Sequence, residues 1–422
     1  MQKHDLLATE RGRRGLFAIL YMTEGAPIGF VWWALPTVLR AQGIAIDSIT
    51  TLTTLATLPW ILKFLIAPAI DVSLGKGGSA KRWILVCQFV MALSLAPLLF
   101  FQWSTSLGLL IAVIVVHATF AAVQDVSIDT FAIRTVPQQE LGRINGWMQA
   151  GMLAGRAGTA AATTAMASLL GDPRPAVLAL IVLIALPAAV LILAVPDREP
   201  RAQADARTPA ISIKPLLNGA LFAGMLVALT VGGGFEFFGV SAGPRLLDTG
   251  NAEAAVSVFF GLLAPAGLAA GALAGGSICD RIGALQATLL GFGTVSAALC
   301  YVAFSHLGLF GLPVAGLVGF TAVYVGIGLL TASSYALFMS LARGPMTATK
   351  FSMLMAMTNA CEAWSGFTGG RLAAVDGYGS AVLTMTLASC VALLPMAILW
   401  RLSAAPAGEA AALTARPGQA PS

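Results

Sequence analysis

The stretch that decides the fold is Val115–Arg134, VVHATFAAVQDVSIDTFAIR. Its apolar residues predict a helix that crosses a bilayer, yet it carries two carboxylates, Asp125 and Asp129, one helical turn apart. A charged side chain costs about 2.5–3.5 kcal/mol at the centre of a membrane helix, and it usually faces a bundle interior or a water-filled cavity. The stretch therefore predicts a helical bundle built around a polar pathway.

The composition of the whole chain also predicts a membrane protein. Of its 422 residues, 58% are apolar and only 10% are charged, whereas a soluble domain has about 25% charged residues. The net charge of +5 comes from basic residues in short loops, which we interpret as topology signals and not as a nucleic-acid surface. The five cysteines show no CxxC spacing, so we predict neither a metal site nor a disulfide framework.

Twelve segments are apolar and long enough to cross a membrane, which predicts an all-α integral membrane protein. They cover residues 15–39, 48–71, 83–103, 107–133, 143–170, 175–195, 215–240, 253–279, 285–305, 308–341, 351–374 and 379–401. The longest polar stretch, 196–214, divides the chain into six-helix halves at 15–195 and 215–403. Residues 1–14 precede the first half, and the Ala-, Pro- and Gly-rich residues 404–422 form a predicted disordered tail.

The basic residues predict the orientation of the chain in the membrane. Eighteen of the 24 lysines and arginines fall in loops on one side and four on the other, and Lys63 and Arg156 lie inside spans. The positive-inside rule then places the N-terminus, the linker and the tail in the cytoplasm. We expect a bacterial-type inner membrane.

Four carboxylates inside the predicted spans are candidates for proton coupling: Glu24, Asp125, Asp129 and Glu362. Two neighbouring carboxylates repel one another when both are charged, which favours a proton on one of them. Asp125 is the deeper of its pair and the stronger candidate. For Asp129 we favour a latch to Lys63, Arg134 or Arg143. For Glu24 and Glu362, a structural role in buried pairing is the alternative.

Further polar side chains in the spans are candidates for binding a solute. Arg156 keeps its charge, so it requires an anion, either a carboxylate on another helix or an acidic group of the solute. The other candidates, for which buried pairing or packing is the alternative, are Gln124, Gln149, Asn359, Glu236 and Trp33. Glu236 follows Gly232–Gly234, and three glycines predict a bend in that helix.

Lys63 lies about two turns from the predicted cytoplasmic end of its span. One interpretation is that its long side chain extends to the membrane surface or pairs with Asp71, Asp125 or Asp129. The other is a direct role in transport. The sequence alone leaves both open.

A short basic loop preceded by an aspartate follows the second span of each half. The first copy is Pro68–Gly75, with Asp71, and the second is Gly275–Gly283, with Asp280 and Arg281. The second copy reads G-x-x-x-x-D-R-x-G and resembles the loop signature of the major facilitator superfamily. The first copy departs from that signature, with proline and valine where the family has glycine and arginine. The resemblance implies two six-helix halves with a solute between them near mid-membrane, and a gating role for these loop residues and Lys63.

Three stretches in the first half, Tyr21–Gly29, Leu58–Asp71 and Gln124–Asp129, resemble the AmpG-type muropeptide permeases, which group with the acetyl-CoA transporters. The LPW-x-L-K-F-L-x-A-P-x-x-D run is the most specific of these matches. This resemblance implies proton-driven import of cell-wall anhydromuropeptides, with Lys63, Asp125 and Asp129 as functional positions.

A sister branch that imports siderophores is at least as similar in Ala34–Arg40 and Leu58–Trp60. Around Arg156 the chain departs from both branches, because Leu153-Ala-Gly155 stands where they tend to show a tyrosine before the arginine. The resemblance therefore implies an importer without fixing its solute.

We predict a secondary active transporter with no cofactor or metal and with the proton gradient as its energy source. Its expected partners are a small organic solute, with an acidic one as an option, and the lipid bilayer, and we expect a monomer. No Walker motif and no nucleophile–base pair is evident, which argues against an enzyme. An exporter is the main alternative; a membrane enzyme and a sensor or scaffold are disfavoured.

Overall fold

The computed structural model describes residues 5–44, 46–196, 216, 218–248, 255, 258–311 and 315–404. These residues form helices and connecting turns, and none of them forms a strand. The helices of the first half are α1 (Glu10–Ile28), α2 (Leu35–Ala41), α3 (Ile46–Gly75), α4 (Ala80–Leu95), α5 (Leu107–Thr135), α6 (Leu141–Leu170) and α7 (Arg174–Ala194). Those of the second half are α8 (Gly219–Thr230), α9 (Gly233–Asp248), α11 (Ala264–Ile282), α12 (Ala284–His306), α13 (Leu317–Ala342), α14 (Thr347–Ser389) and α15 (Leu393–Ala404).

The described residues provide the twelve predicted crossings. Ten segments among them are long and apolar enough to cross a membrane. One of these, Thr347–Ser403, has 57 residues and turns at Gly377, whose φ of 80° is not helical, so it crosses twice. The more polar α6, with 30 residues, lies against α1 and completes the set. The turn at Gly377 falls between the predicted spans 351–374 and 379–401.

Two crossings differ in detail from the prediction. The tenth begins at Leu317 and not at residue 308, because Gly308 and Gly311 adopt positive φ angles of 66° and 62°, a conformation that interrupts a helix. The seventh is broken between α8 and α9, at the glycine triplet where the sequence predicted a bend. Of the predicted linker 196–214, residues 197–214 lie outside the described residues, and so do residues 405–422 of the predicted tail 404–422.

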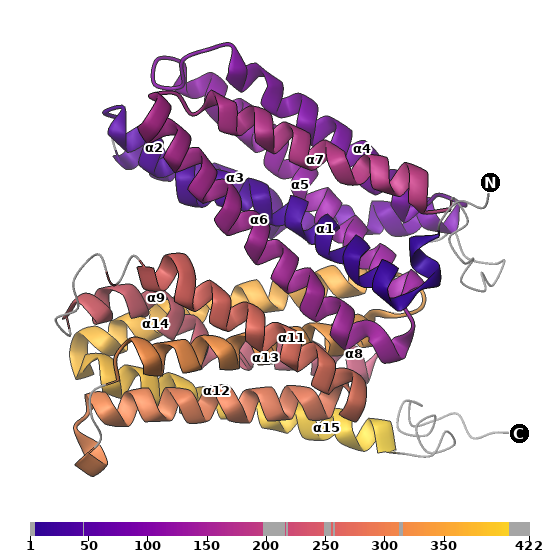
Figure 1. The fold of residues 1–422 in the computed structure, drawn as a ribbon. Coiled ribbons are helices and arrows are strands. Elements are labelled where there is room, and N and C mark those ends of the chain that lie inside the picture. The colour runs from indigo at the N-terminus through magenta and orange to yellow at the C-terminus, as the bar shows by residue number, and fades with distance from the viewer. Residues whose placement is uncertain are drawn as a thin grey trace, which may run out of the picture.

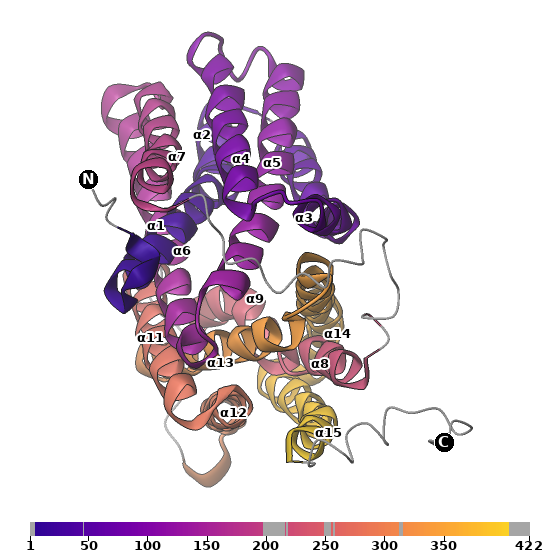
Figure 2. The same ribbon diagram turned by 90° about the vertical axis from the view of Figure 1, so that its right-hand side faces the viewer.

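The helices form two bundles, α1–α7 and α8–α15, which diverge from one end of the molecule to the other (Figure 1). They meet through α6 against α11 and α13, and through α14 against α3 and α5. These contacts lie at the end where α1 begins and α15 ends, which faces the viewer in Figure 2. We call this end, with Asp71, Gly142 and Asp280, the sealed end, and the opposite one the open end.

Glycines bring α1 and α6 into backbone contact. A Cβ atom at Gly25 of α1 would meet the carbonyl oxygen of Met152 on α6, and one at Gly29, directly after α1, would meet that of Arg156. A Cβ atom at Gly155 of α6 would meet the carbonyl oxygen of Met22. Small residues allow such close approach between membrane helices. The contact joins the helix that carries Glu24 to the helix that carries Arg156.

Replacing Gly155 by leucine is expected to destabilise the fold, because the new side chain would collide with the backbone of α1. Overpacking of this kind costs about 1–3 kcal/mol, so the thermal midpoint of the purified protein should fall. Gly158 lies on the same helix with nothing within 4 Å of its Cβ position, and Gly158→Leu is the matched control. Equal midpoints for the two variants would contradict the backbone contact.

Candidate functional site

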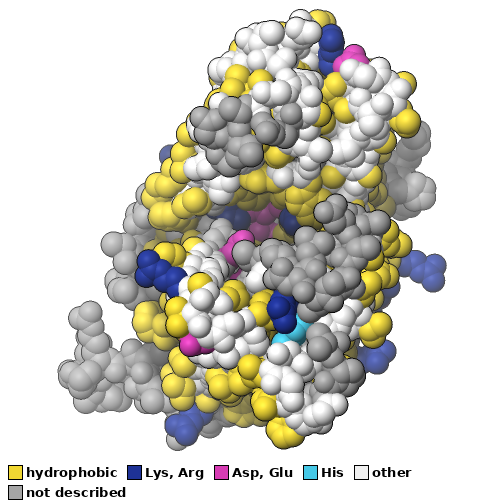
Figure 3. Space-filling view, turned by 90° about the vertical axis from the view of Figure 1, so that its left-hand side faces the viewer, with side chains coloured by type: hydrophobic (Ala, Val, Ile, Leu, Met, Phe, Trp, Pro, Cys, Tyr) yellow, Lys and Arg dark blue, Asp and Glu magenta, His cyan; other side chains and the backbone are white. Residues whose placement is uncertain are grey.

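A cavity of about 590 Å³ lies between the two halves. This volume is within the range of about 300–1,000 Å³ that is usual for small-molecule sites. Figure 3 looks onto the open end and shows a hollow between the bundles with acidic and basic side chains at its bottom. The lining comes from α1, α3, α5 and α6 of the first half and from α13 and α14 of the second. The cavity is therefore shared by both halves and opens at one end.

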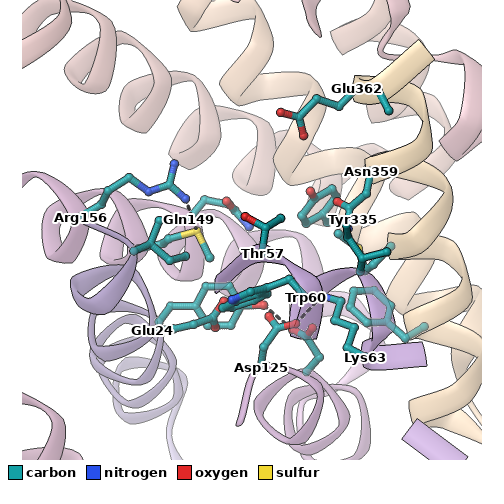
Figure 4. A pocket seen from close by; sticks show the side chains of 18 residues that line it. Glu24, Thr57, Trp60, Lys63, Asp125, Gln149, Arg156, Tyr335, Asn359 and Glu362 are labelled. Atoms are coloured by element: carbon teal, nitrogen blue, oxygen red, sulfur yellow. Dashed lines mark hydrogen bonds and ion pairs between the residues drawn. The ribbon is translucent and has the colours of Figure 1, made fainter. Parts of the chain in front are cut away.

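Four charged side chains gather at the base of this cavity, from three helices of the first half (Figure 4). Lys63 of α3 forms an ion pair with Asp125 of α5, and each side chain is only 8% exposed. Tyr21 of α1 donates a hydrogen bond from its hydroxyl group to Asp129. Glu24 interacts electrostatically with Asp125, and neither of its buried carboxylate oxygens has a hydrogen-bond partner among the described residues.

We call Glu24, Lys63, Asp125 and Asp129 the carboxylate cluster. With one cation for three carboxylates, full ionisation leaves two excess negative charges buried in a membrane bundle. Uncompensated buried charge is strongly unfavourable, and carboxylates in such a position favour holding a proton. The cluster therefore combines three carboxylates with a single cation in a buried position.

For Lys63, the structure shows pairing with an aspartate, which is one part of the first interpretation, and a role in transport stays a prediction. Its Nζ atom faces Asp125 and lies 5.5 Å from the ring centre of Trp60, and the residue is buried. The side chain thus pairs inside the bundle and does not extend to the membrane surface. Asp129, for which a latch was favoured, is held by Tyr21, while two of its expected partners contact other carboxylates: Lys63 contacts Asp125, and Arg143 contacts Glu10 and Asp280.

Other predicted site residues line the upper part of the cavity. Arg156 and Gln149 extend from α6, and Asn359 and Glu362 from α14, so the two pairs face the cavity from opposite halves (Figure 4). The guanidinium carbon of Arg156 lies 5.4 Å from the ring centre of Trp33, and its Nη2 atom is 3.6 Å from the Sδ atom of Met152. The charged groups are thus distributed over both walls.

Three predicted residues lie outside the lining. Gln124 is fully buried in α5, and neither polar atom of its amide group has a hydrogen-bond partner among the described residues. Glu236 lies on α9 behind the cavity wall and interacts electrostatically with Glu362. Trp33 is absent from the lining but lies beside Arg156, which belongs to it. These positions support the lining and do not form it.

Sequence reasoning missed several neutral residues that line the cavity, among them Tyr21, Thr57, Trp60 and Tyr335. Tyr21 precedes Glu24 by three residues, so helical spacing gave a signal that the two side chains share a face. Tyr335 of α13 gave none, because a tyrosine in an apolar helix is not costly and does not attract notice.

The aspartates of the two predicted loop signatures lie at the sealed end and bind helix N-termini of the opposite half. Asp71 of α3 accepts hydrogen bonds from the backbone N–H groups of Ala348 and Thr349 on α14, at 3.0 and 2.8 Å. Asp280 of α11 accepts from the backbone N–H of Arg143 on α6 at 3.1 Å. A carboxylate is favourable at a helix N-terminus.

These paired contacts hold the halves together even though the first loop copy is degenerate. Two further hydrogen bonds cross the same interface: Asn145 donates to the carbonyl oxygen of Ala332 and Arg343 to that of Val136, both at 2.7 Å. Arg281, the basic residue of the second signature, is exposed.

The family model of the major facilitator superfamily matches residues 17–370. The chain therefore belongs to the major facilitator superfamily. Members of this family are transporters and not enzymes, so the chain is a multi-pass membrane transporter for a small-molecule solute.

Solved structures of the same fold cover nearly the whole chain. FucP, a fucose:proton symporter of E. coli, solved in the outward conformation, has a TM-score of 0.72 and 13% identity over 92% of this chain and 98% of its own. A bacterial homologue of the iron transporter ferroportin, in an outward-facing state, has a TM-score of 0.64 and 15% identity, with 92% and 99% covered. At these identities the likeness shows the fold alone.

One curated relative shares a shorter region. An uncharacterized protein of Haemophilus influenzae is 29% identical over 138 residues, which are 31% of this chain and 32% of that protein. The match thus spans about a third of the relative's length.

Proposed function

We propose that this transporter couples the import of an organic solute to the entry of protons across a bacterial inner membrane. The observation that carries the proposal is the carboxylate cluster at the base of a cavity that is open at one end and sealed at the other. Proton binding changes the charge of this cluster. That change shifts the equilibrium between two conformations only if the conformations differ in how well they stabilise the charged cluster. The inter-half cavity supplies that difference, because its base is hydrated in one state and closed off in the other.

The proposed direction, import, agrees with the orientation that the basic loops predict for the chain. The cavity opens at the end opposite the sealed end, where α1 begins and α15 ends (Figures 1 and 3). With the termini in the cytoplasm, as the basic loops indicate, this conformation faces outward and exposes the cluster to the side from which protons enter. Cleavage of N- and C-terminal tags by protease in inverted membrane vesicles, but not in intact spheroplasts, tests this orientation. We further propose that the transporter acts as a monomer.

For the solute we propose an anhydromuropeptide or a related compound. Support comes from the Leu58–Asp71 run, which contributes Trp60, Ile61 and Lys63 to the cavity, and from its resemblance to AmpG-type permeases. A ferric siderophore is the second candidate, because Leu58–Trp60 is shared with that branch.

Uptake into proteoliposomes with an imposed inward proton gradient tests the proposal. We expect a labelled anhydromuropeptide to accumulate above the external concentration, and a protonophore to collapse the accumulation. A ferric siderophore is assayed in parallel to test the alternative solute. If it accumulates and the muropeptide does not, the proposed coupling mechanism stands and the assigned solute becomes a siderophore. The import direction is wrong if neither compound accumulates and the inward proton gradient instead drives one of them out of preloaded vesicles. Accumulation that a protonophore leaves unchanged would contradict proton coupling.

A further inference from the structure

One cation in the cavity lacks an ion-pair partner among the described residues. Arg156 forms no ion pair within 4 Å with any carboxylate of the described residues, and its Nε atom has no hydrogen-bond partner there. Its polar contact is the weak one to the thioether of Met152, and its guanidinium carbon lies 5.4 Å from the ring centre of Trp33. An arginine cannot lose its charge to relieve this situation. Arg156 is thus a cation with no direct ion pair among the described residues, placed beside an aromatic ring.

An anion on the opposite wall, the exposed Glu362, also forms no ion pair with any cation of the described residues. Glu362 of α14 lines the cavity, and its carboxylate points into the open space (Figure 4). Within the described part of the chain no donor or cation binds that carboxylate; the hydrogen bond at this residue is accepted by its backbone carbonyl oxygen from Ser365. Glu362 interacts electrostatically with Arg156 across the cavity, although no ion pair joins them.

We propose that the transported solute is zwitterionic: an anionic group of the solute binds Arg156, and a cationic amine binds Glu362. This inference rests on the proposed transport function and adds the charge pattern of the solute to it. Because the two side chains belong to different halves, a solute bound to both bridges α6 and α14. It would thereby draw the open end together.

Other charge patterns fit the cavity less well. A neutral sugar would displace water from both side chains and leave both charges unpaired, which is costly. A purely anionic solute would satisfy Arg156 but face Glu362 and the carboxylate cluster. A purely cationic solute would face Arg156. A zwitterion compensates both side chains and adds no net charge to the cavity.

Glu24 is the competing partner for Arg156, since the two also interact electrostatically. In the described structure, however, both carboxylate oxygens of Glu24 lack a hydrogen-bond partner, so no guanidinium group binds them. Substitution of Arg156 separates its two possible roles. If Arg156 binds the solute, its replacement changes which ligands bind. If it is only a partner of Glu24, its replacement changes only the response to protons.

Binding of short peptides to the purified full chain tests the inference without any gradient. The probes are dialanine and trialanine, each in a free form, an N-acetylated form without the amine and a C-amidated form without the carboxylate. Quenching of tryptophan fluorescence reports binding, because Trp60 lines the cavity and Trp33 faces Arg156. We expect at least one free peptide to bind at least about tenfold more tightly than either blocked form, since charge-assisted hydrogen bonds are worth about that much.

Two single variants sharpen the test. In Arg156→Gln the preference for a free carboxylate should disappear while the preference for a free amine remains, and in Glu362→Gln the reverse should hold. Each variant thus retains one preference as evidence that it is folded. Arg371→Gln is the matched control: Arg371 lies on α14 over Phe367, outside the cavity lining, and both preferences should persist.

The inference is wrong if no free peptide binds better than its blocked forms, or if Arg156→Gln retains the preference for a carboxylate. The proposed transport function fails on a different result, the absence of gradient-driven uptake. Binding with both end preferences but without proton-driven accumulation would support the zwitterionic site and overturn the coupling. Proton-driven uptake of a solute without an anionic group or without a cationic group would support the coupling and overturn the zwitterionic site.

Discussion

Replacing Asp125 by asparagine is expected to abolish proton-driven accumulation of the solute while exchange of solute across the membrane continues. Asparagine has the shape of a protonated aspartate but cannot release a proton. The variant would therefore behave as a permanently protonated cluster, which changes conformation with solute bound but cannot complete the part of the cycle that releases a proton. Uptake with an inward proton gradient should fall to the level reached without one, and counterflow in solute-loaded vesicles should persist.

The position of Asp125 explains why its effect should exceed that of its neighbours. It pairs with Lys63, interacts with Glu24 and lies one turn from Asp129, so each charge in the cluster responds to its protonation. Removal of one partner from a buried ion pair costs about 3–5 kcal/mol when the other is left uncompensated. The asparagine oxygen still accepts a hydrogen bond from Lys63, and the remaining carboxylates are nearby, which limits this cost.

A surface aspartate provides the matched control for this substitution. Asp172 is about 41% exposed in its side chain and pairs with Arg174 outside the bundle core. Asp172→Asn makes the same chemical change and should leave accumulation at the wild-type level. Normal accumulation by Asp125→Asn at every pH would exclude Asp125 as the proton site. Loss of counterflow together with accumulation would indicate a structural role.

The sequence was sufficient to place the membrane crossings and most of the cavity charges. A charge in the middle of an apolar span is costly wherever it occurs, so Glu24, Asp125 and Glu362 were visible as candidates without any knowledge of packing. Their convergence on one cavity follows, because a bundle has only one interior in which such groups avoid lipid. The bend at Gly232–Gly234 was visible for a similar local reason, the conformational freedom of glycine.

The ion-pair and hydrogen-bond partners of these side chains could not be predicted in the same way, because they depend on how the helices are rotated against one another. Lys63 had three aspartates within plausible reach, and the structure selects Asp125. Asp129 was expected to bind a cation and instead accepts a hydrogen bond from Tyr21. A neutral hydroxyl group has no signature in an apolar helix, and its contact with a carboxylate 108 positions away arises from the packing of α1 against α5.

Replacing Gly146 by leucine is expected to open the sealed end. Gly146 of α6 faces α11 of the other half, and a Cβ atom there would lie 2.6 Å from the carbonyl oxygen of Ala272. Backbone cannot move aside as a side chain can, so the two helices must separate. Overpacking costs about 1–3 kcal/mol, which would shift the balance between the two states by about 5- to 150-fold toward the one with this end open.

A native cysteine reports this change directly. Cys279 lies on α11 at the same interface, beside Gly142, and is buried. Alkylation of the purified protein by a maleimide, followed by peptide mass spectrometry, should show Cys279 reacting at least about fivefold faster in Gly146→Leu than in the wild type. Gly158→Leu, on the same helix but facing open space, should leave the rate unchanged.

Cys87 distinguishes an opened transporter from an unfolded one, because it is buried within the first half and away from the interface. It should stay protected in Gly146→Leu if the halves move as bodies, and it should react together with Cys279 if the bundle melts. Protection of both cysteines would mean that α6 and α11 tolerate the leucine, so that their contact does not seal this end. The aspartate contacts at the helix N-termini would then carry the seal, because Asp71 and Asp280 each bind backbone N–H groups of the opposite half.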